Sequence, residues 1–363
     1  MTEAEVDVRA PDPVDWGTAR RVARFVTGSE PLADSYLAGS LTADFDALTV
    51  QAEALVSDYT GLRAPGHVSA RVLDRRDWVD SNIASMRRLL SPLMERFAER
   101  LARNPLAPVS RHVAAGELGL LLGYLSQRVL GQYDLLVPDD PRGDAVYYVG
   151  ANVLGLEKRF AFRPRDFRLW IAIHEVTHRA QFTGVPWMRE YFLSLVHETL
   201  RLVDPDPSTF FRAVSQAVEE MRRGRNPLDE GGLVALFATP EQRGVLAKVQ
   251  ALMSLLEGHG NVVMSELGRR HVAGEERMER VLQQRRKAVG IAAQLQKLLG
   301  LEQKMRQYEV GERFVRGVMD SAGARSVDMA WVGPENLPSI VELDDPAAWL
   351  RRVTPASAHR VGG

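Results

Sequence analysis

Residues 171–182, I-A-I-H-E-V-T-H-R-A-Q-F, contain the pattern H-E-x-x-H at His174, Glu175 and His178. Residues four apart on an α-helix lie above one another on the same face. If this stretch is helical, the two histidines can aim their imidazole nitrogens at one point.

The residues around the motif favour a mostly buried helix. The run Arg163-Pro164-Arg165-Asp166 is typical of a helix start, with Asp166 as the candidate N-cap. Gly184 and Pro186 are expected to end the helix. Apolar cover comes from Phe167, Trp170, Ile171 and Ile173.

These side chains point to a zinc site. Imidazole suits zinc, and a catalytic zinc ion takes three protein ligands and a water molecule. Glu175 lies beside His174 at the edge of the same face, where it can remove a proton from the metal-bound water as a general base. The competing interpretation is that both histidines are ordinary core residues and that Glu175 belongs to a local ion pair.

A third ligand is expected from residues 250–268, whose apolar residues recur at helical spacing. Glu257 lies inside this apolar run, and a buried carboxylate needs a cation or hydrogen-bond donors nearby. Gly258 and Gly260 each cost about 1 kcal/mol in a helix interior. Such glycines are tolerated where another backbone comes close, and we expect the H-E-x-x-H helix to be that neighbour.

Two residues of this stretch compete for the ligand position. Glu257 is the preferred candidate, with Asn261 one turn later holding one of the histidines by a hydrogen bond from behind. His259 is the competing ligand. If Glu257 is the ligand, we expect His259, like Asn261, to contact a ligand side chain without binding the metal itself. A site without a third protein ligand also stays open.

Short motifs along nearly the whole chain resemble those of the actinobacterial zincin-like family, long catalogued as a domain of unknown function. They are Val14-Asp15-Trp16, H-E-V-T-H-R-A-Q-F, V-P-W-M-R-E at 185–190, L-M-S-L-L-E-G-H at 252–259 and G-P-E-N-L-P at 333–338. Members of this family are labelled hydrolases, zinc-dependent metalloproteases or proteins associated with biosynthesis of the deazaflavin coenzyme. The resemblance implies a zincin-like fold with a thermolysin-like metal site.

One position departs from the pattern of the family. The resemblance leads us to expect an aspartate four residues after Glu257, and Asn261 stands there instead. Asparagine can still accept a hydrogen bond from an imidazole N–H, but it carries no charge that would raise the basicity of the ligand.

The resemblance also suggests where a substrate would lie. In zincins the edge strand before the metal-binding helix pairs with extended substrates, so residues 147–152 would line the cleft. The alternative is an ordinary strand of the sheet. On the helix expected at residues 187–202, either Tyr191 or His197 could stabilise the oxyanion of the transition state.

Composition excludes several other classes of site. The chain has 363 residues, 45% of them hydrophobic, a net charge of −1 and no cysteine. The charge argues against nucleic acid and anionic membranes as partners, and the lack of cysteine excludes disulfides, thiolate metal sites and a cysteine nucleophile. The acidic N-terminus has no apolar segment typical of a signal peptide, so we expect a cytoplasmic protein.

The fold is expected to be mainly α, of the α+β class, with two lobes around a cleft. Residues 1–13 are predicted to be a flexible arm, 14–132 a helical lobe, 133–353 the zincin-like lobe with the metal site, and 354–363 a disordered tail. Strands predicted at residues 135–137 and 145–152 place a small β element beside the H-E-x-x-H helix. The most apolar run, residues 113–130, contains glycines that favour a buried core helix over a membrane-spanning one.

The sequence therefore predicts a zinc-dependent hydrolase, most simply a metallopeptidase in which Glu175 activates a zinc-bound water. One alternative is a zinc hydrolase of a small amide. Another is a zincin-fold scaffold or binding protein with weak catalysis. The expected substrate is a peptide or a small amide, and the sequence does not predict an oligomeric state.

Overall fold

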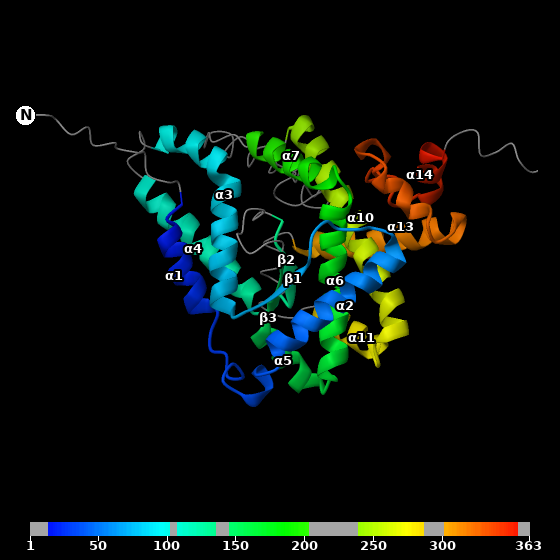
Figure 1. Ribbon diagram of the computed structural model, residues 1–363. Helices are drawn as coiled ribbons and strands as arrows, with labels where there is room; N and C mark the ends of the chain where they lie inside the picture. The colour runs from blue at the N-terminus through cyan, green and yellow to red at the C-terminus, as the bar shows by residue number, and fades with distance from the viewer. Residues whose placement is uncertain (1–13, 102–106, 136–144, 203–238, 287–300, 355–363) are drawn as a thin grey trace, which may run out of the picture.

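The computed structural model describes residues 14–101, 107–135, 145–202, 239–286 and 301–354. These residues form a mostly helical molecule with one small three-stranded sheet (Figure 1). The predicted α+β class, mainly α with a small β element, is confirmed. The predicted arm at residues 1–13 and the predicted tail beyond residue 354 lie outside the described residues.

Two helices carry the residues predicted for the metal site, since α6 contains the whole H-E-x-x-H stretch and α10 contains residues 250–268. The described helices, in chain order, are α1 (Trp16–Val26), α2 (Leu41–Thr60), α3 (Arg75–Leu101), α4 (Ala107–Ser126), α5 (Gly150–Phe160), α6 (Pro164–Gly184), α7 (Met188–Arg201), α10 (Pro240–His271), α11 (Glu275–Arg286), α13 (Leu301–Ala322) and α14 (Pro346–Val353). Short 3₁₀ turns are η1 (Tyr36–Ala38), η2 (Ser326–Trp331) and η3 (Pro334–Asn336).

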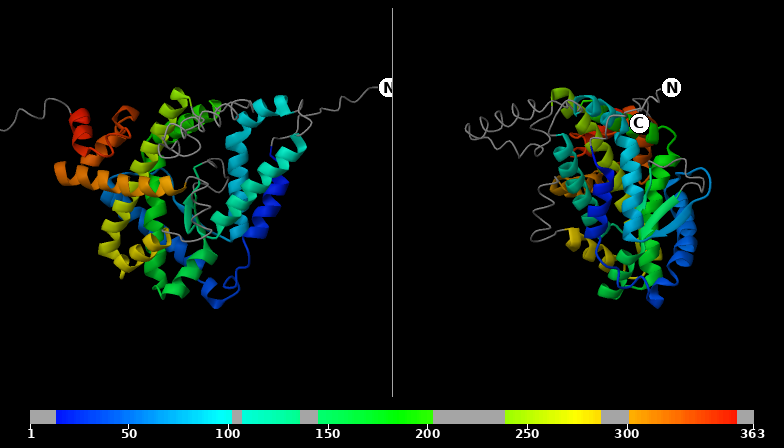
Figure 2. Two further views of the ribbon diagram at one scale, coloured as in Figure 1. Left: turned by 180° about the vertical axis from the view of Figure 1, so that it is seen from behind. Right: turned by 90° about the vertical axis from the view of Figure 1, so that its left-hand side faces the viewer.

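The helices pack around apolar cores on either side of the metal-site helix α6. Helices α1, α3 and α4 enclose a small core that includes Ala23, Trp78 and Leu122. Helices α13 and α14 lie on the opposite side of the molecule, as the views in Figure 2 show, and their core with α10 includes Phe314 and Trp349. Helix α2, helix α6 and the sheet share the core between these two groups.

Helix α4 contains residues 113–126 of the most apolar run and packs closely against α1. A Cβ built on Gly119 would lie 2.6 Å from the carbonyl oxygen of Ala19, and one built on Gly123 would lie 2.5 Å from Cβ of Val26, so α1 comes close at these two glycines of the run. A Cβ on the third, Gly116, would meet nothing within 4 Å. Only one face of the helix is covered, because Val113 and Leu120 are more than half exposed. Among the described ranges, no helix has the length and apolar character needed to cross a membrane.

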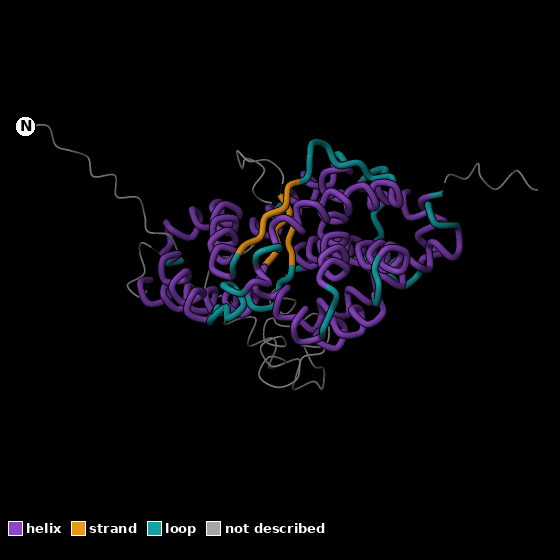
Figure 3. The backbone as a smooth tube through the Cα atoms, turned by 60° about the horizontal axis from the view of Figure 1, so that its bottom comes forward, coloured by secondary structure: helices purple, strands orange, loops and turns teal. Residues whose placement is uncertain are grey.

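The sheet has the strand order β1-β3-β2, where β1 is Ser69–Leu73, β2 is Gly131–Tyr133 and β3 is Ala145–Val149. Its strands are drawn in orange in Figure 3. Strand β3 is parallel to β1, antiparallel to β2, and buried along its whole length. The prediction that residues 147–152 form an edge strand is therefore wrong. Residues 147–149 lie in the central strand, and residues 150–152 begin α5.

The other strand prediction is displaced along the chain. Leu135 lies in a turn directly after β2, and residues 136–137 lie outside the described residues. Strand β1 was not predicted, because its five residues are only half-buried and include Ser69 and Arg71, which interrupt the apolar pattern.

Helix α2 packs along α6 and helps to position it. Two buried arginines of α6 form ion pairs with acids of α2, Arg168 with Asp44 and Arg179 with Glu53. The predicted lobe boundary, between residues 132 and 133, falls inside β2, and α2 shares its core with α6. The division into two lobes around a cleft stays a prediction.

Candidate metal centre

Helix α6 carries the two histidines of the motif on successive turns. It begins at Pro164, whose ring presets a helical φ, so Asp166 lies in the first turn and the prediction that Asp166 caps the helix is wrong. His174 and His178 share one face, and their Nε2 atoms lie 3.2 Å apart. The two rings are nearly perpendicular, with 82° between their planes.

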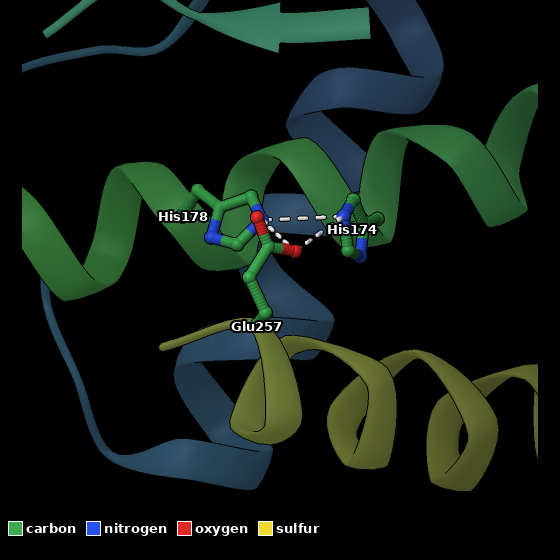
Figure 4. A group of neighbouring side chains, drawn as sticks. All are labelled: His174, His178 and Glu257. Carbon is green, nitrogen blue, oxygen red and sulfur yellow. Dashed lines mark hydrogen bonds and ion pairs between the residues drawn. The ribbon is translucent and has the colours of Figure 1, made fainter. Parts of the chain in front are cut away.

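Glu257 of α10 points at the same place from the facing helix (Figure 4). Its Oε2 lies 3.6 Å from Nε2 of His178 and 3.9 Å from Nε2 of His174. The three side chains are between 15% and 18% exposed, so the cluster is largely shielded from solvent. A Cβ built on Gly260 would lie 3.4 Å from Cε1 of His178, which shows how closely α10 approaches the rings.

The triangle formed by these three atoms fits a zinc ion. Zinc bonds of about 2.0–2.1 Å at tetrahedral angles separate neighbouring ligand atoms by about 3.3 Å. The three observed separations are 3.2, 3.6 and 3.9 Å. Two imidazoles and one carboxylate are also a donor set used by catalytic zinc sites, and they leave a fourth position for another ligand.

Gln181, one turn after His178, determines which nitrogen of His178 faces the cluster. The amide nitrogen of Gln181 donates to the carbonyl oxygen of Leu256 at 2.9 Å, so its Oε1 must face the other way. That oxygen lies 2.9 Å from Nδ1 of His178 and accepts a hydrogen bond from it. In the neutral ring the proton is therefore on Nδ1, and Nε2 presents a lone pair to His174 and Glu257.

A positive charge between the two Nε2 atoms and Oε2 of Glu257 would stabilise their close approach. Burial lowers the pKa of His178, but the charge of Glu257, a hydrogen bond to it, and smaller contributions from Glu175 and Gln181 together raise this pKa to about 9. A proton or a metal ion between the three atoms relieves their mutual repulsion, and a metal ion that binds here displaces the proton.

Glu175 lies on α6 beside the cluster, with its carboxyl group against strand β2. Burial raises the pKa of Glu175 to about 7, although the nearby His178 opposes the shift. The backbone N–H of Tyr133 donates a hydrogen bond to the carboxylate. A Cβ built on Gly131 would lie 2.5 Å from Cγ of Glu175, so this carboxyl position requires glycine at residue 131.

His259 points away from the three converging atoms. Its Nδ1 lies 2.9 Å from the amide nitrogen of Gln181, and its ring packs edge-on against Trp331. Burial lowers the pKa of His259 to about 3, so the ring is neutral and Nδ1 accepts the hydrogen bond. His259 thus lies behind His178, connected to it through Gln181.

Three further predicted site residues lie outside this cluster. Asn261 is buried, but its Oδ1 has no hydrogen-bond partner among the described residues, so the predicted bond to a histidine is not formed. On α7, Tyr191 packs edge-on against Trp187, and His197 is exposed. The oxyanion roles of Tyr191 and His197 stay predictions.

The sequence contained a signal for one of the two residues that were missed. Gln181 follows His178 by three positions, which places both on one helical face, so a polar side chain there could have been recognised as a partner of the ring. Gly131 could not have been recognised, because nothing in the sequence shows that β2 lies against Glu175.

Comparisons with known proteins agree with this geometry. Residues 14–350 match the model of a family described as "Zincin-like metallopeptidase", which bears out the zincin-like part of the resemblance. A crystal structure from Chloroflexus aurantiacus, described as "a putative hydrolase with a novel fold", is 33% identical, with a TM-score of 0.70 over 93% of this chain and 98% of that chain. Among curated proteins, none matches significantly. The chain belongs to the zincin-like metallopeptidase family.

Proposed function

We propose that the protein is a zinc-dependent hydrolase of amide bonds, with a peptide as the first-choice substrate. One observation carries this proposal: the carboxyl group of Glu175 is buried directly beside three atoms that converge as zinc ligands do. A site with only a structural role would need no acid at that place. Family membership supports hydrolysis as the type of reaction.

Three side chains would hold the metal, through Nε2 of His174, Nε2 of His178 and Oε2 of Glu257. Zinc bound there would supply a Lewis acid that polarises a carbonyl group and makes water more acidic. Gln181 keeps the Nε2 lone pair of His178 directed at the ion by holding Nδ1–H.

Glu175 would act first as a base and then as an acid. Its carboxylate takes a proton from a water molecule, whose oxygen attacks the carbonyl carbon of the substrate. The C–N bond then breaks, and the protonated Glu175 returns the proton to the leaving nitrogen. Each cycle consumes one water, and the proton taken from that water ends on the leaving nitrogen.

A small amide is the second candidate substrate. The limited exposure of the three ligand side chains, 15–18%, favours a compact substrate over a folded protein. A scaffold with weak catalysis is the third possibility and predicts no turnover of either class.

Zinc content and activity, measured on the same preparations, test this function. Elemental analysis should find about one zinc ion per chain, and His178→Ala should lose it. Screening with a peptide library and a panel of small amides should identify a substrate. Glu175→Gln should retain zinc and lose about 10²–10⁴-fold in kcat, because an amide cannot accept the proton.

Two results would count against the proposal. A protein that contains no zinc and takes up none when it is added would favour the scaffold. Full activity in Glu175→Gln would exclude the water-activation mechanism even if zinc is bound.

A further inference from the structure

A small pocket lies beside the metal centre, between helices α6, α10, α11 and α13. Its buried floor is formed by Trp170, Asn261 and Glu275, and half-buried Glu279 and Glu312 line its sides. None of these residues is a predicted metal ligand, and the hydrolase mechanism uses none of them.

Two residues of the pocket floor lie on the same helix faces as the predicted metal ligands, one turn away from them. Trp170 precedes His174 by four residues on α6, and Asn261 follows Glu257 by four residues on α10. At 1.5 Å per residue, each pair is separated by about 6 Å along its helix. The pocket is therefore about one helical turn away from the metal centre.

Three polar side chains of the floor have a buried atom with no hydrogen-bond partner in the described part of the chain. These atoms are Nε1 of Trp170, Oδ1 of Asn261 and Oε1 of Glu275. Their residues are only 1%, 7% and 4% exposed. An unsatisfied buried polar atom costs about 1–3 kcal/mol, so three of them in one pocket indicate a ligand that pairs with them.

Gly268 of α10 leaves room for Glu275 and Trp170 to lie beside the same point of the helix. A Cβ built on Gly268 would lie 2.6 Å from Cγ of Glu275 and 3.3 Å from Nε1 of Trp170. The carboxyl group and the indole N–H thus border the same small space without bonding to each other.

The pocket favours a positive charge. Glu312 is paired with Arg316 at 3.0 Å, but Oε1 of Glu275 has no such partner. Burial and the neighbouring Glu279 raise the pKa of Glu275, despite the opposing charges of Arg269 and Arg316. A cation in the pocket would compensate for this burial and stabilise the ionised carboxylate.

Size and hydrogen-bonding groups narrow the choice of cation. The pocket has a volume of about 30 Å³, and one water-sized group needs roughly 10–15 Å³. Among the described residues that line this space, two buried acceptor atoms and one buried donor atom have no hydrogen-bond partner. A primary ammonium group with a neighbouring oxygen atom fits this space, whereas an aromatic ring does not.

We propose that the pocket binds a primary ammonium group of the substrate that is hydrolysed at the metal centre. Oε1 of Glu275 and Oδ1 of Asn261 accept hydrogen bonds from the ammonium group. Nε1–H of Trp170 donates to a carbonyl oxygen beside it. The group is either the amino terminus of a peptide or a lysine side chain, and its assignment to a substrate rests on the proposed hydrolase function.

Binding of n-butylammonium tests the site without any catalysis. Calorimetric titration of zinc-loaded protein should show binding of n-butylammonium and none of the neutral n-butanol. Glu275→Gln should weaken binding about 10-fold or more, because it removes a charged partner. The matched control is Glu276→Gln, an exposed glutamate in the same first turn of α11, which should bind as wild type does.

Failure to bind n-butylammonium, or equal binding by Glu275→Gln and wild type, would overturn the proposal. Because this assay needs no turnover, it does not depend on the proposed hydrolase function. Binding without hydrolysis of any peptide or small amide would leave the ammonium site supported and the hydrolase function overturned.

Two pairs of peptides identify the source of the ammonium group. One pair compares a free with an acetylated amino terminus, and the other compares an internal lysine with norleucine. One pair should show a preference of about 10-fold or more in kcat/KM for the charged member, retained in Glu276→Gln and lost in Glu275→Gln. Equal rates within both pairs would overturn the assignment to the substrate.

Discussion

Gly258 of α10 and Gly311 of α13 touch backbone to backbone, and a Cβ built on Gly258 would lie 2.1 Å from the carbonyl carbon of Gly311. This crossing fixes α10 at the residue next to Glu257. The sequence predicted that Gly258 makes room for the H-E-x-x-H helix, but its neighbour is α13. The glycine of α10 that lies against His174 and His178 is Gly260 instead.

Gly258→Ala should destabilise the protein by about 1–3 kcal/mol, because both helix backbones must move apart. Urea unfolding measures the change. The matched control is Gly244→Ala on the same helix, where a Cβ meets nothing within 4 Å. That change should stabilise the protein by up to about 1 kcal/mol, because alanine is the better helix former. A neutral Gly258→Ala would show that the crossing is looser than the geometry indicates.

Glu257→Gln should weaken zinc binding more than His259→Ala does. Glu257 contributes a charged oxygen to the converging atoms, whereas His259 only contacts Gln181 behind them. Loss of a residue behind the ligands typically costs about 10–100-fold in metal affinity, and loss of a ligand should exceed this. Competition with a chromogenic chelator measures both variants. The reverse order would make His259 the third ligand.

Gln181→Leu should lower zinc affinity about 10–100-fold, because Nδ1 of His178 loses the acceptor that fixes its tautomer. Gln181→Glu keeps an acceptor for His178 but loses the bond to the carbonyl oxygen of Leu256. This second variant should recover most of the zinc affinity while unfolding as easily as Gln181→Leu. If both variants lose zinc affinity equally, Gln181 contributes to packing and does not act by fixing the tautomer of His178.

Gly131→Ala should reduce kcat about 10²-fold with zinc still bound, because the added methyl group displaces the carboxyl group of Glu175. Steady-state kinetics on the substrate found by screening, together with elemental analysis, provide the measurement. Gly155→Ala in α5 is the control, since its Cβ meets nothing within 4 Å. Unchanged kcat in Gly131→Ala would remove Glu175 from the reaction or show that β2 can move away.

Glu342 provides a test of pH dependence far from the metal centre. Its carboxylate binds Arg352 through two hydrogen bonds of 2.6 and 3.0 Å, and this pairing lowers the pKa of Glu342 to about 2. A pKa below that of the unfolded chain stabilises the fold above about pH 4.5, and this contribution is lost as the pH falls towards 2.

Glu342→Gln should therefore reduce the free energy of unfolding by about 1 kcal/mol at pH 7. The difference from wild type should shrink steadily between pH 4.5 and pH 3. Urea unfolding of both proteins over this range measures it. A difference that stays constant with pH would show that the ion pair contributes nothing beyond the packing of the two side chains.

Sequence spacing alone determined which residues could meet along a helix. His174 and His178 share a face because the α-helix repeats every 3.6 residues, whatever packs around it. Glu257 was identified because a carboxylate in an apolar helix needs a cation or donors. The links to deazaflavin coenzyme biosynthesis and to an actinobacterial source stay implications of the motif resemblance.

Only the tertiary structure decided how separate elements meet. Glu257 faces the histidines while His259 contacts Gln181, because the packing of α10 against both α6 and α13 decides which side of the helix meets each neighbour. Pairing with β3 places strand β2 beside Glu175. The ammonium pocket is formed by residues of four helices, which come together only in the folded chain. Helical periodicity is a local property of the chain, whereas helix rotation and sheet order depend on packing between residues far apart in sequence, which no local pattern encodes.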